Sequence, residues 1–219
     1  MVMKREFKQL ANQGPSCQDD RQLKRRCPQH VLSEIPKYSV SQLGHIEPVS
    51  FVKSCLKAHC VNADINDTAY FLEPTNEHLA AYEPDVIEAI RSNDIEYLRS
   101  VKAEGRSLQG CNRFGESLIH LACRRSSMDI VAFLVADGYV CLRVKDDVGR
   151  TPLHDACWKK EPNFALVDLI LDAEPELLLV ADKRGHTPLE YVRREHWGQW
   201  IQYLAVRMKK DINRLSITK

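Results

Sequence analysis

Long apolar runs are missing from this sequence: no stretch approaches the ~18 consecutive apolar residues that a membrane-spanning helix needs. The first residues, MVMKREFKQL, are charged and lack the apolar core of a secretory signal. The Gly-x-Gly-x-x-Gly, Walker-type and Gly-x-Ser-x-Gly patterns are also missing, so the sequence gives no positive sign of an enzyme. We therefore expect no membrane insertion, no small-molecule substrate and no cofactor. The expected location is intracellular: the cytoplasm, with the nucleus left open.

Net charge is nearly absent, because 31 Lys and Arg residues face 30 Asp and Glu residues, a formal charge of +1. Nothing global therefore indicates a nucleic-acid or membrane protein, although a local basic face can exist within a neutral total. The eight cysteines could form disulfides, but a chain of 219 residues with many aliphatic side chains does not need them. We expect mostly free thiols.

The first part of the chain divides into two segments of different composition. Residues 1–47 are rich in Gln, Ser, Pro and charge, which predicts a disordered, mildly basic arm. Its basic cluster KRRCPQH, at 24–30, is either a nuclear-import signal or solvated charge. In residues 48–82, SFVKSCL and TNEHLAAY predict helices. We expect this helical extension to cap the first unit of the region that follows, through Phe51, Val52, Leu56, Leu79 and Tyr82. The alternative is that the segment is a separate docking motif for another protein.

Cysteine and histidine recur in two early segments, which raises the question of zinc. CPQH supplies Cys27 and His30, and CLKAHC supplies Cys55, His59 and Cys60. A structural zinc site needs four ligands, commonly in closely spaced pairs, and these spacings fit no standard finger. We predict no metal site.

From residue 83 the chain repeats itself. GESLIHLACRR, GRTPLHDACWK and GHTPLEYVRRE begin at 115, 149 and 185, and the spacings between Ser117, Thr151 and Thr187 are 34 and 36 residues. Each unit begins with a turn whose glycine tolerates a positive φ. A Ser or Thr then caps a short helix, and an amphipathic second helix follows. A related pattern without the signature begins at Pro84.

These repeats resemble the ankyrin-repeat family, which has turn–helix–helix units of about 33 residues and a Thr-Pro-Leu-His signature. The resemblance implies an all-α solenoid with short hairpin-like turns. We expect four repeats at about 83–112, 113–146, 147–182 and 183–210, followed by a tail at 211–219. The residues that the resemblance makes structural are Ser117, His120, Thr151, Pro152, Leu153, His154, Thr187 and Pro188.

Two features depart from the family pattern. The third repeat is longer, and its additional residues, WKKEPNF at 158–164, predict a loop because Pro162 interrupts helix. The fourth repeat has Glu190 where the family has histidine, which predicts a less rigid unit. It also carries REHWGQW, which we expect to place Trp197 and Trp200 around the turn between its helices.

RTPLHDACW, at 150–158, contains the residue types of a thiol active site. The resemblance instead gives His154 a structural role, bridging Thr151 and neighbouring backbone groups. Cys157 occupies a position where the family has a small buried residue. His154 and Cys157 are three residues apart, so activation of the thiol remains the least favoured alternative. We predict no catalytic residue.

In ankyrin-like arrays the partner binds a concave surface of hairpin tips and first-helix ends. Most side chains predicted for this groove are basic, and two are aromatic, which suits an acidic peptide or protein surface. The groove residues are Arg113, Phe114, Glu116, Arg124, Arg125, Asp147, Val148, Arg150, Trp158, Lys159, Lys183, Arg184, His186, Arg194 and Glu195.

The predicted function is therefore protein recognition by a monomeric adaptor or scaffold. The alternative is binding of nucleic acid or a phosphorylated ligand in the same groove. Glu116, Asp147 and Glu195 argue against nucleic acid, because carboxylates repel phosphate.

Overall fold

The computed structural model describes residues 45–58, 70–125 and 127–215, with side chains of the last helix as far as Asp211. The chain divides into two units, Met1–Ser33 and Glu34–Lys219, and every described residue belongs to the second. The predicted arm, apart from residues 45–47, lies outside the described residues, as do Cys27, His30, His59 and Cys60. The described part of the tail at 211–215 continues the last helix.

The described residues form helices joined by turns and loops. The α-helices are α2 (Pro48–Ala58), α3 (Asn76–Ala80), α4 (Pro84–Ser92), α5 (Ile95–Ala103), α6 (Leu118–Arg125), α7 (Met128–Ala136), α8 (Pro152–Cys157), α9 (Phe164–Ala173) and α10 (Trp197–Leu215). The 3₁₀ helices are η4 (Pro175–Leu179), η5 (Pro188–Tyr191) and η6 (Arg194–His196).

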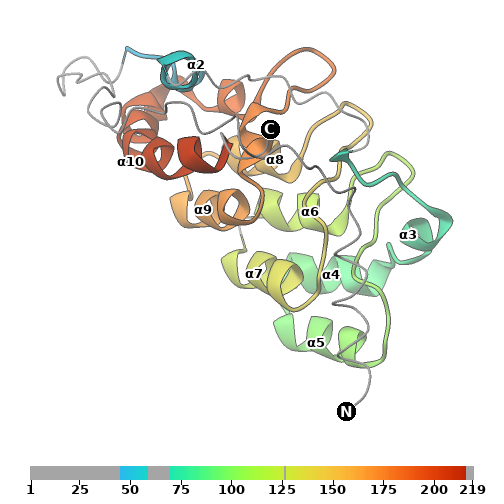
Figure 1. The fold of residues 1–219 in the computed structure, drawn as a ribbon. Helices are drawn as coiled ribbons and strands as arrows, with labels where there is room; N and C mark the ends of the chain where they lie inside the picture. The colour runs from blue at the N-terminus through green and yellow to red at the C-terminus, as the bar shows by residue number, and fades with distance from the viewer. Residues whose placement is uncertain (1–44, 59–69, 126, 216–219) are drawn as a thin grey trace, which may run out of the picture. The chain divides into compact units, whose positions relative to one another are not determined.

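The helices stack in two layers, as the repeat pattern predicts. Helices α4, α6, α8 and η5 follow one another in the first layer, and α5, α7 and α9 follow one another in the second (Figure 1). Buried Leu, Ile and Val side chains such as Leu118, Ile130 and Leu166 fill the space between them. The predicted all-α repeat solenoid is confirmed.

The hairpin turns between repeats form as the glycine pattern predicts. The backbone N–H of Asn112, Asp146 and Asp182 donates to the carbonyl four residues later in each turn, at 2.9 Å. Gly115 adopts φ 72°, and a Cβ there would lie 2.7 Å from the Lys145 carbonyl oxygen. Both the dihedral angle and the close approach require glycine.

The fourth repeat differs from the others. Its first helix is the short 3₁₀ helix η5, while its second is the 19-residue α10. The expectation that both tryptophans surround the inter-helix turn is wrong for Trp200. It lies inside α10, is 1% exposed and meets the Phe164 ring edge-on at 5.2 Å between centroids. The loop predicted around Pro162 is present between α8 and α9.

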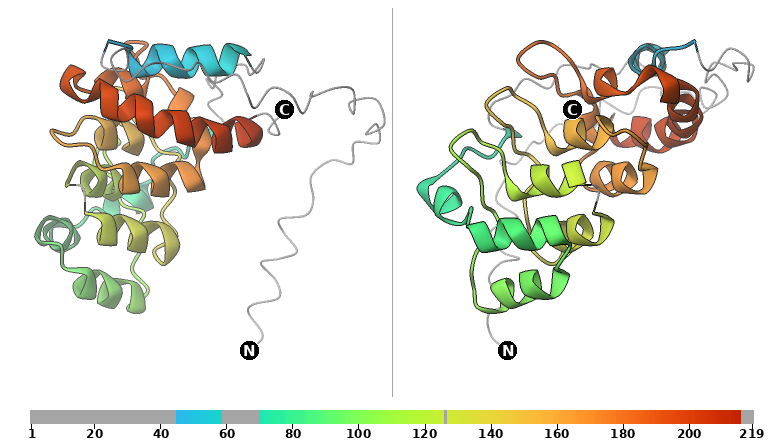
Figure 2. Two further views of the ribbon diagram at one scale, coloured as in Figure 1. Left: turned by 90° about the vertical axis from the view of Figure 1, so that its left-hand side faces the viewer. Right: turned by 180° about the vertical axis from the view of Figure 1, so that it is seen from behind.

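The N-terminal extension contacts both ends of the stack, but its first helix does so at the opposite end from the one we expected. Helix α2 packs against α10 and η5 of the last repeat, as both views show (Figures 1 and 2). The expectation that Phe51, Val52 and Leu56 cover repeat one is therefore wrong. All three are buried, at the far end of the stack.

A physical reason for this placement lies in the two end repeats. Repeat one presents a polar network, in which Arg106 pairs with Glu83 at 2.5 Å and with Asp85 at 2.8 Å, and Tyr97 donates to Asp85. Helix α10, in contrast, contributes the buried apolar side chains Trp200, Ile201, Leu204 and Met208, and α2 packs against this helix. Leu79 of α3 is exposed, whereas Tyr82 is half-buried and packs against the core. Helix α3 lies beside the end of repeat one, where the Cys111 N–H donates to the His78 carbonyl at 2.9 Å.

Candidate protein-binding site

The signature histidine of repeat three joins two repeats. His154 Nδ1 accepts from the Thr151 backbone N–H at 3.0 Å and lies 2.9 Å from its hydroxyl oxygen. Because a backbone N–H donates to Nδ1, the ring hydrogen is on Nε2, which donates to the His186 carbonyl at 3.1 Å. Burial lowers the pKa of His154 to about 4. The ring is therefore neutral at pH 7 and has a structural role.

His120 repeats this arrangement one unit earlier. Its Nδ1 lies 2.7 Å from the Ser117 hydroxyl oxygen, and its Nε2 lies 3.0 Å from the Arg150 carbonyl oxygen. Burial lowers the pKa of His120 as well. In the fourth repeat Glu190 replaces the imidazole: one carboxylate oxygen accepts from the Thr187 backbone N–H at 2.5 Å and from its hydroxyl at 3.1 Å.

The cysteines beside these histidines are not arranged as nucleophiles. Cys157 is buried, and burial raises the pKa of its thiol; the same holds for Cys123. A reactive thiolate needs a lowered pKa and access to substrate. His154, the proposed base, already uses both ring nitrogens, and Asp155 faces Arg124 at 3.3 Å. Cys111, Cys123, Cys141 and Cys157 are free thiols.

The hairpin tips are linked from repeat to repeat. The Asp147 N–H donates to the Phe114 carbonyl at 2.7 Å, and the Lys183 N–H donates to the Val148 carbonyl at 2.9 Å. The structure thus brings the predicted tip residues into one continuous row. Their exposed side chains are Arg113, Phe114, Asp147, Lys183, Arg184 and His186, whereas Glu116, Val148 and Arg150 are half-buried.

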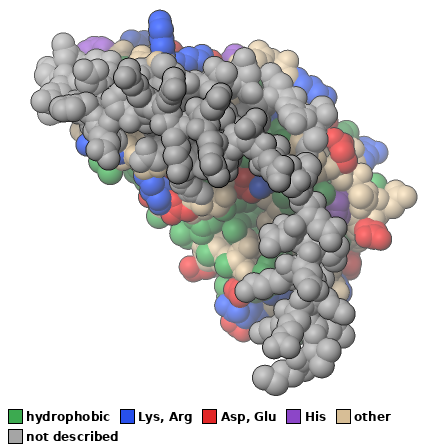
Figure 3. Space-filling model, viewed as in Figure 1, with side chains coloured by type: hydrophobic (Ala, Val, Ile, Leu, Met, Phe, Trp, Pro, Cys, Tyr) green, Lys and Arg blue, Asp and Glu red, His purple; other side chains and the backbone are tan. Residues whose placement is uncertain are grey.

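Intramolecular contacts occupy several of the predicted groove cations. Arg124 pairs with Glu116 at 2.5 Å and with the buried Asp155, and Arg150 pairs with the buried Asp146 at 2.7 Å. Lys159 donates to the carbonyl oxygen of Arg124. Basic and acidic side chains are interspersed on the face shown in Figure 3. The groove is accordingly less positive than its count of basic residues suggests.

Other helix-end residues remain available to a partner. Trp158, which caps α8, is 53% exposed and meets Tyr191 edge-on, and Phe114 at the second tip is 49% exposed. Arg125 is exposed, with its guanidinium 3.3 Å from the Arg91 carbonyl oxygen. Arg194 and Glu195 are exposed in η6.

Sequence reasoning missed the side chains that shape the tips. Oδ1 of Asn112 accepts from the N–H groups two and four residues later, and Asp146 and Asp182 do the same, at 2.7–3.1 Å. All three precede the turn glycine by three residues. They recur with the same spacings of 34 and 36 residues as the signature, so aligning the repeats would have identified them. Because the two carboxylates are committed to these bonds, they serve the turn geometry.

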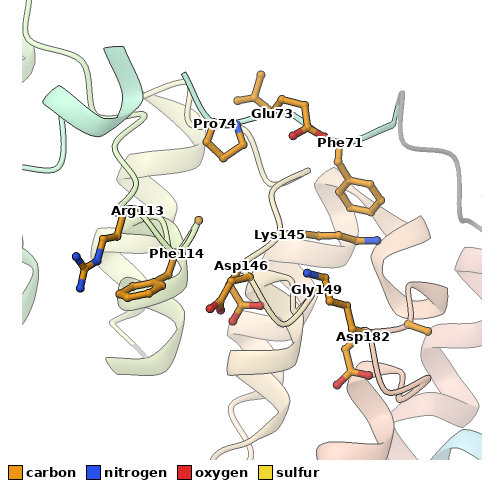
Figure 4. Close-up of a pocket in the computed structure, with 14 residues that line it drawn as sticks. Phe71, Glu73, Pro74, Arg113, Phe114, Lys145, Asp146, Gly149 and Asp182 are labelled. Atoms are coloured by element: carbon orange, nitrogen blue, oxygen red, sulfur yellow. The ribbon is translucent and has the colours of Figure 1, made fainter. Parts of the chain in front are cut away.

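The sequence analysis also missed that an extended segment lies beside the hairpin tips. Residues 70–74, which we call the strap, cross the chain leading to the third hairpin, where the Leu72 N–H donates to the Arg143 carbonyl at 2.8 Å. Between the strap and three successive tips lies a cavity of about 590 Å³, which we call the strap pocket (Figure 4). The run AYFLEP predicts an extended segment, but a single sequence does not show where that segment docks.

Comparisons with known proteins agree with this architecture. Residues 78–178 match the family model for ankyrin repeats in three copies. The SMC5-SMC6 complex localization factor protein 1 of Bos taurus is 37% identical over 78 residues, which are 36% of this chain and 7% of that protein. The putative ankyrin repeat protein YahD of Escherichia coli is 30% identical over 118 residues, 52% of this chain and 57% of that protein.

This chain therefore spans a small part of the first of these relatives and just over half of the second. Ankyrin repeats are generally protein–protein interaction modules and typically not enzymes. Within the described residues, no helix is both long and apolar enough to cross a membrane. The repeat architecture and the matched signature lead to one conclusion: residues 78–178 belong to the ankyrin-repeat family.

Proposed function

We propose that this chain is an adaptor or scaffold that binds an acidic peptide or acidic protein surface at its hairpin tips and first-helix ends. The observation that carries the proposal is the exposure of two large aromatic side chains, Trp158 and Phe114, among exposed Arg and Lys residues. Aromatic and arginine side chains dominate the binding energy of many protein interfaces. Guanidinium groups also form paired hydrogen bonds with carboxylates.

The pairing of the groove cations refines which residues hold the partner. Arg124 and Arg150 already have carboxylate partners, so we assign them to the support of the groove. Arg125, Lys183 and Arg184 are exposed and supply the positive charge that a partner meets. A relative whose name describes a localization factor of a protein complex is consistent with an adaptor. We propose that the chain acts inside the cell as a monomer.

We propose no catalytic function, because His154, Asp155 and Cys157 of repeat three are buried. Both ring nitrogens of His154 also form hydrogen bonds that stabilise the fold. Nucleic acid is the competing ligand for the same cations. Binding to phosphate depends steeply on salt. A titration with a generic single-stranded oligonucleotide at low salt distinguishes the two, and tight binding there would replace an acidic peptide as the ligand.

Selection from a display library of random peptides tests the proposal on the full chain. We expect enrichment of peptides rich in Asp and Glu. Charge reversal of Arg125, Lys183 and Arg184 to Glu should weaken their binding about tenfold or more, because each contact loses attraction and gains repulsion. The matched control reverses Lys53, Lys57 and Lys209, exposed lysines on α2 and α10, and changes the net charge equally. Equal weakening by both variants would reject a localised groove.

A further inference from the structure

The turns between the two helices of successive repeats carry basic side chains that bond to the repeat before them. The Arg125 guanidinium lies 3.3 Å from the carbonyl oxygen of Arg91, which is in the last turn of α4. The Lys159 ammonium donates to the carbonyl oxygen of Arg124, in the last turn of α6. The partners are 34 and 35 residues apart, so the same contact recurs from one repeat to the next. We call Arg91, Arg125 and Lys159 the cation row.

These carbonyl bonds fix the position of the cations but do not neutralise them. A guanidinium has five N–H donors and an ammonium has three, so Arg125 and Lys159 keep donors for another acceptor. Among the described residues the cation row forms no ion pair with a carboxylate, whereas Arg124 pairs with Asp155. Burial lowers the pKa of Lys159, which Asp155 raises and the nearby charge of Arg125 lowers further. An anion bound between these cations would relieve their repulsion.

The carboxylates on the same turns are fewer than the basic side chains, and some of them are engaged. Asp94 accepts the backbone N–H three residues later as the cap of α5, and Glu195 lies 3.8 Å from Arg193. Asp129 and Glu161 are exposed and oppose the row. The basic side chains on the four turns are Arg91, Arg124, Arg125, Lys159, Lys160, Arg193 and Arg194. This edge of the repeats is therefore locally positive although the whole chain is nearly neutral.

The spacing of the cation row selects the conformation of the ligand. Helices α4, α6 and α8 follow one another in the first layer (Figure 1), and packed helices lie about 8–10 Å apart. A polyproline II segment has three residues per turn and rises about 3.1 Å per residue. Every third side chain of such a segment therefore points the same way, about 9 Å from the previous one. Carboxylates with that spacing can reach the cations of three successive repeats.

We infer that the cation row binds an acidic segment in the polyproline II conformation, which lies across repeats one to three and presents Asp or Glu at every third position. The inference rests on the proposed function and deepens it in two ways. It adds Arg91 of repeat one to the binding residues, and it sets the direction and the charge spacing of the partner. Arginine side chains suit this role because a guanidinium can donate two parallel hydrogen bonds to one carboxylate.

Two fluorescent peptides of the same composition test the spacing on the full chain. The spaced peptide repeats Glu-Pro-Ser three times, and the clustered peptide begins with its three Glu residues and continues with Pro and Ser. Fluorescence anisotropy at low ionic strength gives their affinities. Arg91→Gln and Arg125→Gln each remove one cation of the row, and Arg99→Gln, a matched control, removes an exposed arginine of α5. Thermal melting confirms that each variant is folded.

We expect the spaced peptide to bind about fivefold more tightly than the clustered one. Arg91→Gln and Arg125→Gln should each weaken its binding about threefold, and Arg99→Gln by less than about 1.5-fold. Equal affinities for the two peptides, or an Arg91→Gln variant that binds the spaced peptide like the wild type, overturn the inference.

Failure of the inference can be distinguished from failure of the proposed function. If the spacing has no effect but charge reversal of Arg125, Lys183 and Arg184 still weakens the binding of library-selected acidic peptides, the proposed function stands without the cation row. A library that enriches no acidic peptide overturns both. An oligonucleotide that binds more tightly than the spaced peptide also overturns both, because nucleic acid is then the ligand of these cations.

Discussion

Acidification tests the structural role of the signature histidines. In the unfolded chain His154 has the ordinary pKa of 6.5, whereas burial lowers its pKa to about 4 in the folded chain. As the pH falls below 6.5, the unfolded state therefore takes up a proton that the folded state does not. The stabilisation is complete above pH 6.5, declines as the pH falls, and is fully lost near pH 4. His120, whose pKa is also lowered, acts in the same direction.

The size of the effect follows from the difference between the two pKa values. One pKa unit corresponds to about 1.4 kcal/mol, so His154 alone should reduce the free energy of unfolding by about 3 kcal/mol between pH 6.5 and 4. This is a large part of the total for a small domain. Carboxylates such as Asp182, whose pKa is lowered below 3.8, lose their contribution at a lower pH. Burial raises the pKa of Asp155, so this carboxylate takes up a proton in the folded state first and opposes the histidine effect as the pH falls.

Urea unfolding followed by circular dichroism, at several pH values between 7.5 and 4, measures this dependence. His154→Gln can still donate to the His186 carbonyl, and His154→Asn can still accept from the Thr151 N–H. Each should lose about 1–2 kcal/mol at pH 7 because one bond is missing. The difference between wild type and either variant should shrink as the pH falls below 6.5 and reverse in sign near pH 4, because wild type loses about 3 kcal/mol there and the variants lack the titrating ring. A constant difference, or a His154 ring that titrates near 6.5 by NMR, would refute the reasoning.

Three further predictions concern the stability of the fold, each measured by urea unfolding. Phe51→Ala should lower the free energy of unfolding by about 3 kcal/mol because the ring is buried at the α10 end; hydrogen exchange should rise in α10 before α4, and the reverse order would contradict the placement of α2. Gly115→Ala should cost more than Gly105→Ala, because both have a positive φ but a Cβ meets backbone only at Gly115; equal costs would show that the close approach is unimportant. Arg207→Met should cost about 3 kcal/mol because it leaves the buried Asp211 carboxylate without its ion pair at 2.6 Å; a neutral effect would mean that apolar packing replaces this pair.

The repeat architecture could be predicted because its determinants are local. The turn glycines, the capping residues and the signature histidines act over three or four residues and recur with the period of the repeat. The hydrogen bonds of His154 to Thr151 and to the next repeat are contacts of the kind that the resemblance implies. Even the tip anchors Asn112, Asp146 and Asp182 were present in the same register.

The placement of the extension could not be predicted, because it depends on contacts between residues far apart in sequence. The apolar face formed by Phe51, Val52 and Leu56 shows that this helix packs against another part of the protein. It does not show which end of the solenoid that part is. Repeat one presents a polar network and the last repeat ends in the long helix α10, and neither feature is visible from the sequence of α2 alone. The same holds for the strap, whose partner is the carbonyl oxygen of Arg143.

The charge of the groove shows the same limit more sharply. The sequence shows how many basic residues the groove contains, whereas binding of a partner depends on which of them already form ion pairs within the chain. Arg124 and Arg150 look equivalent to Arg125 and Arg184 in the repeat pattern, yet the first two face carboxylates at 2.5–2.7 Å. Reversing a paired cation would place two negative charges together and weaken the fold itself. Reversing Arg125, Lys183 or Arg184 breaks no ion pair among the described residues, so these are the cations that can report on the partner.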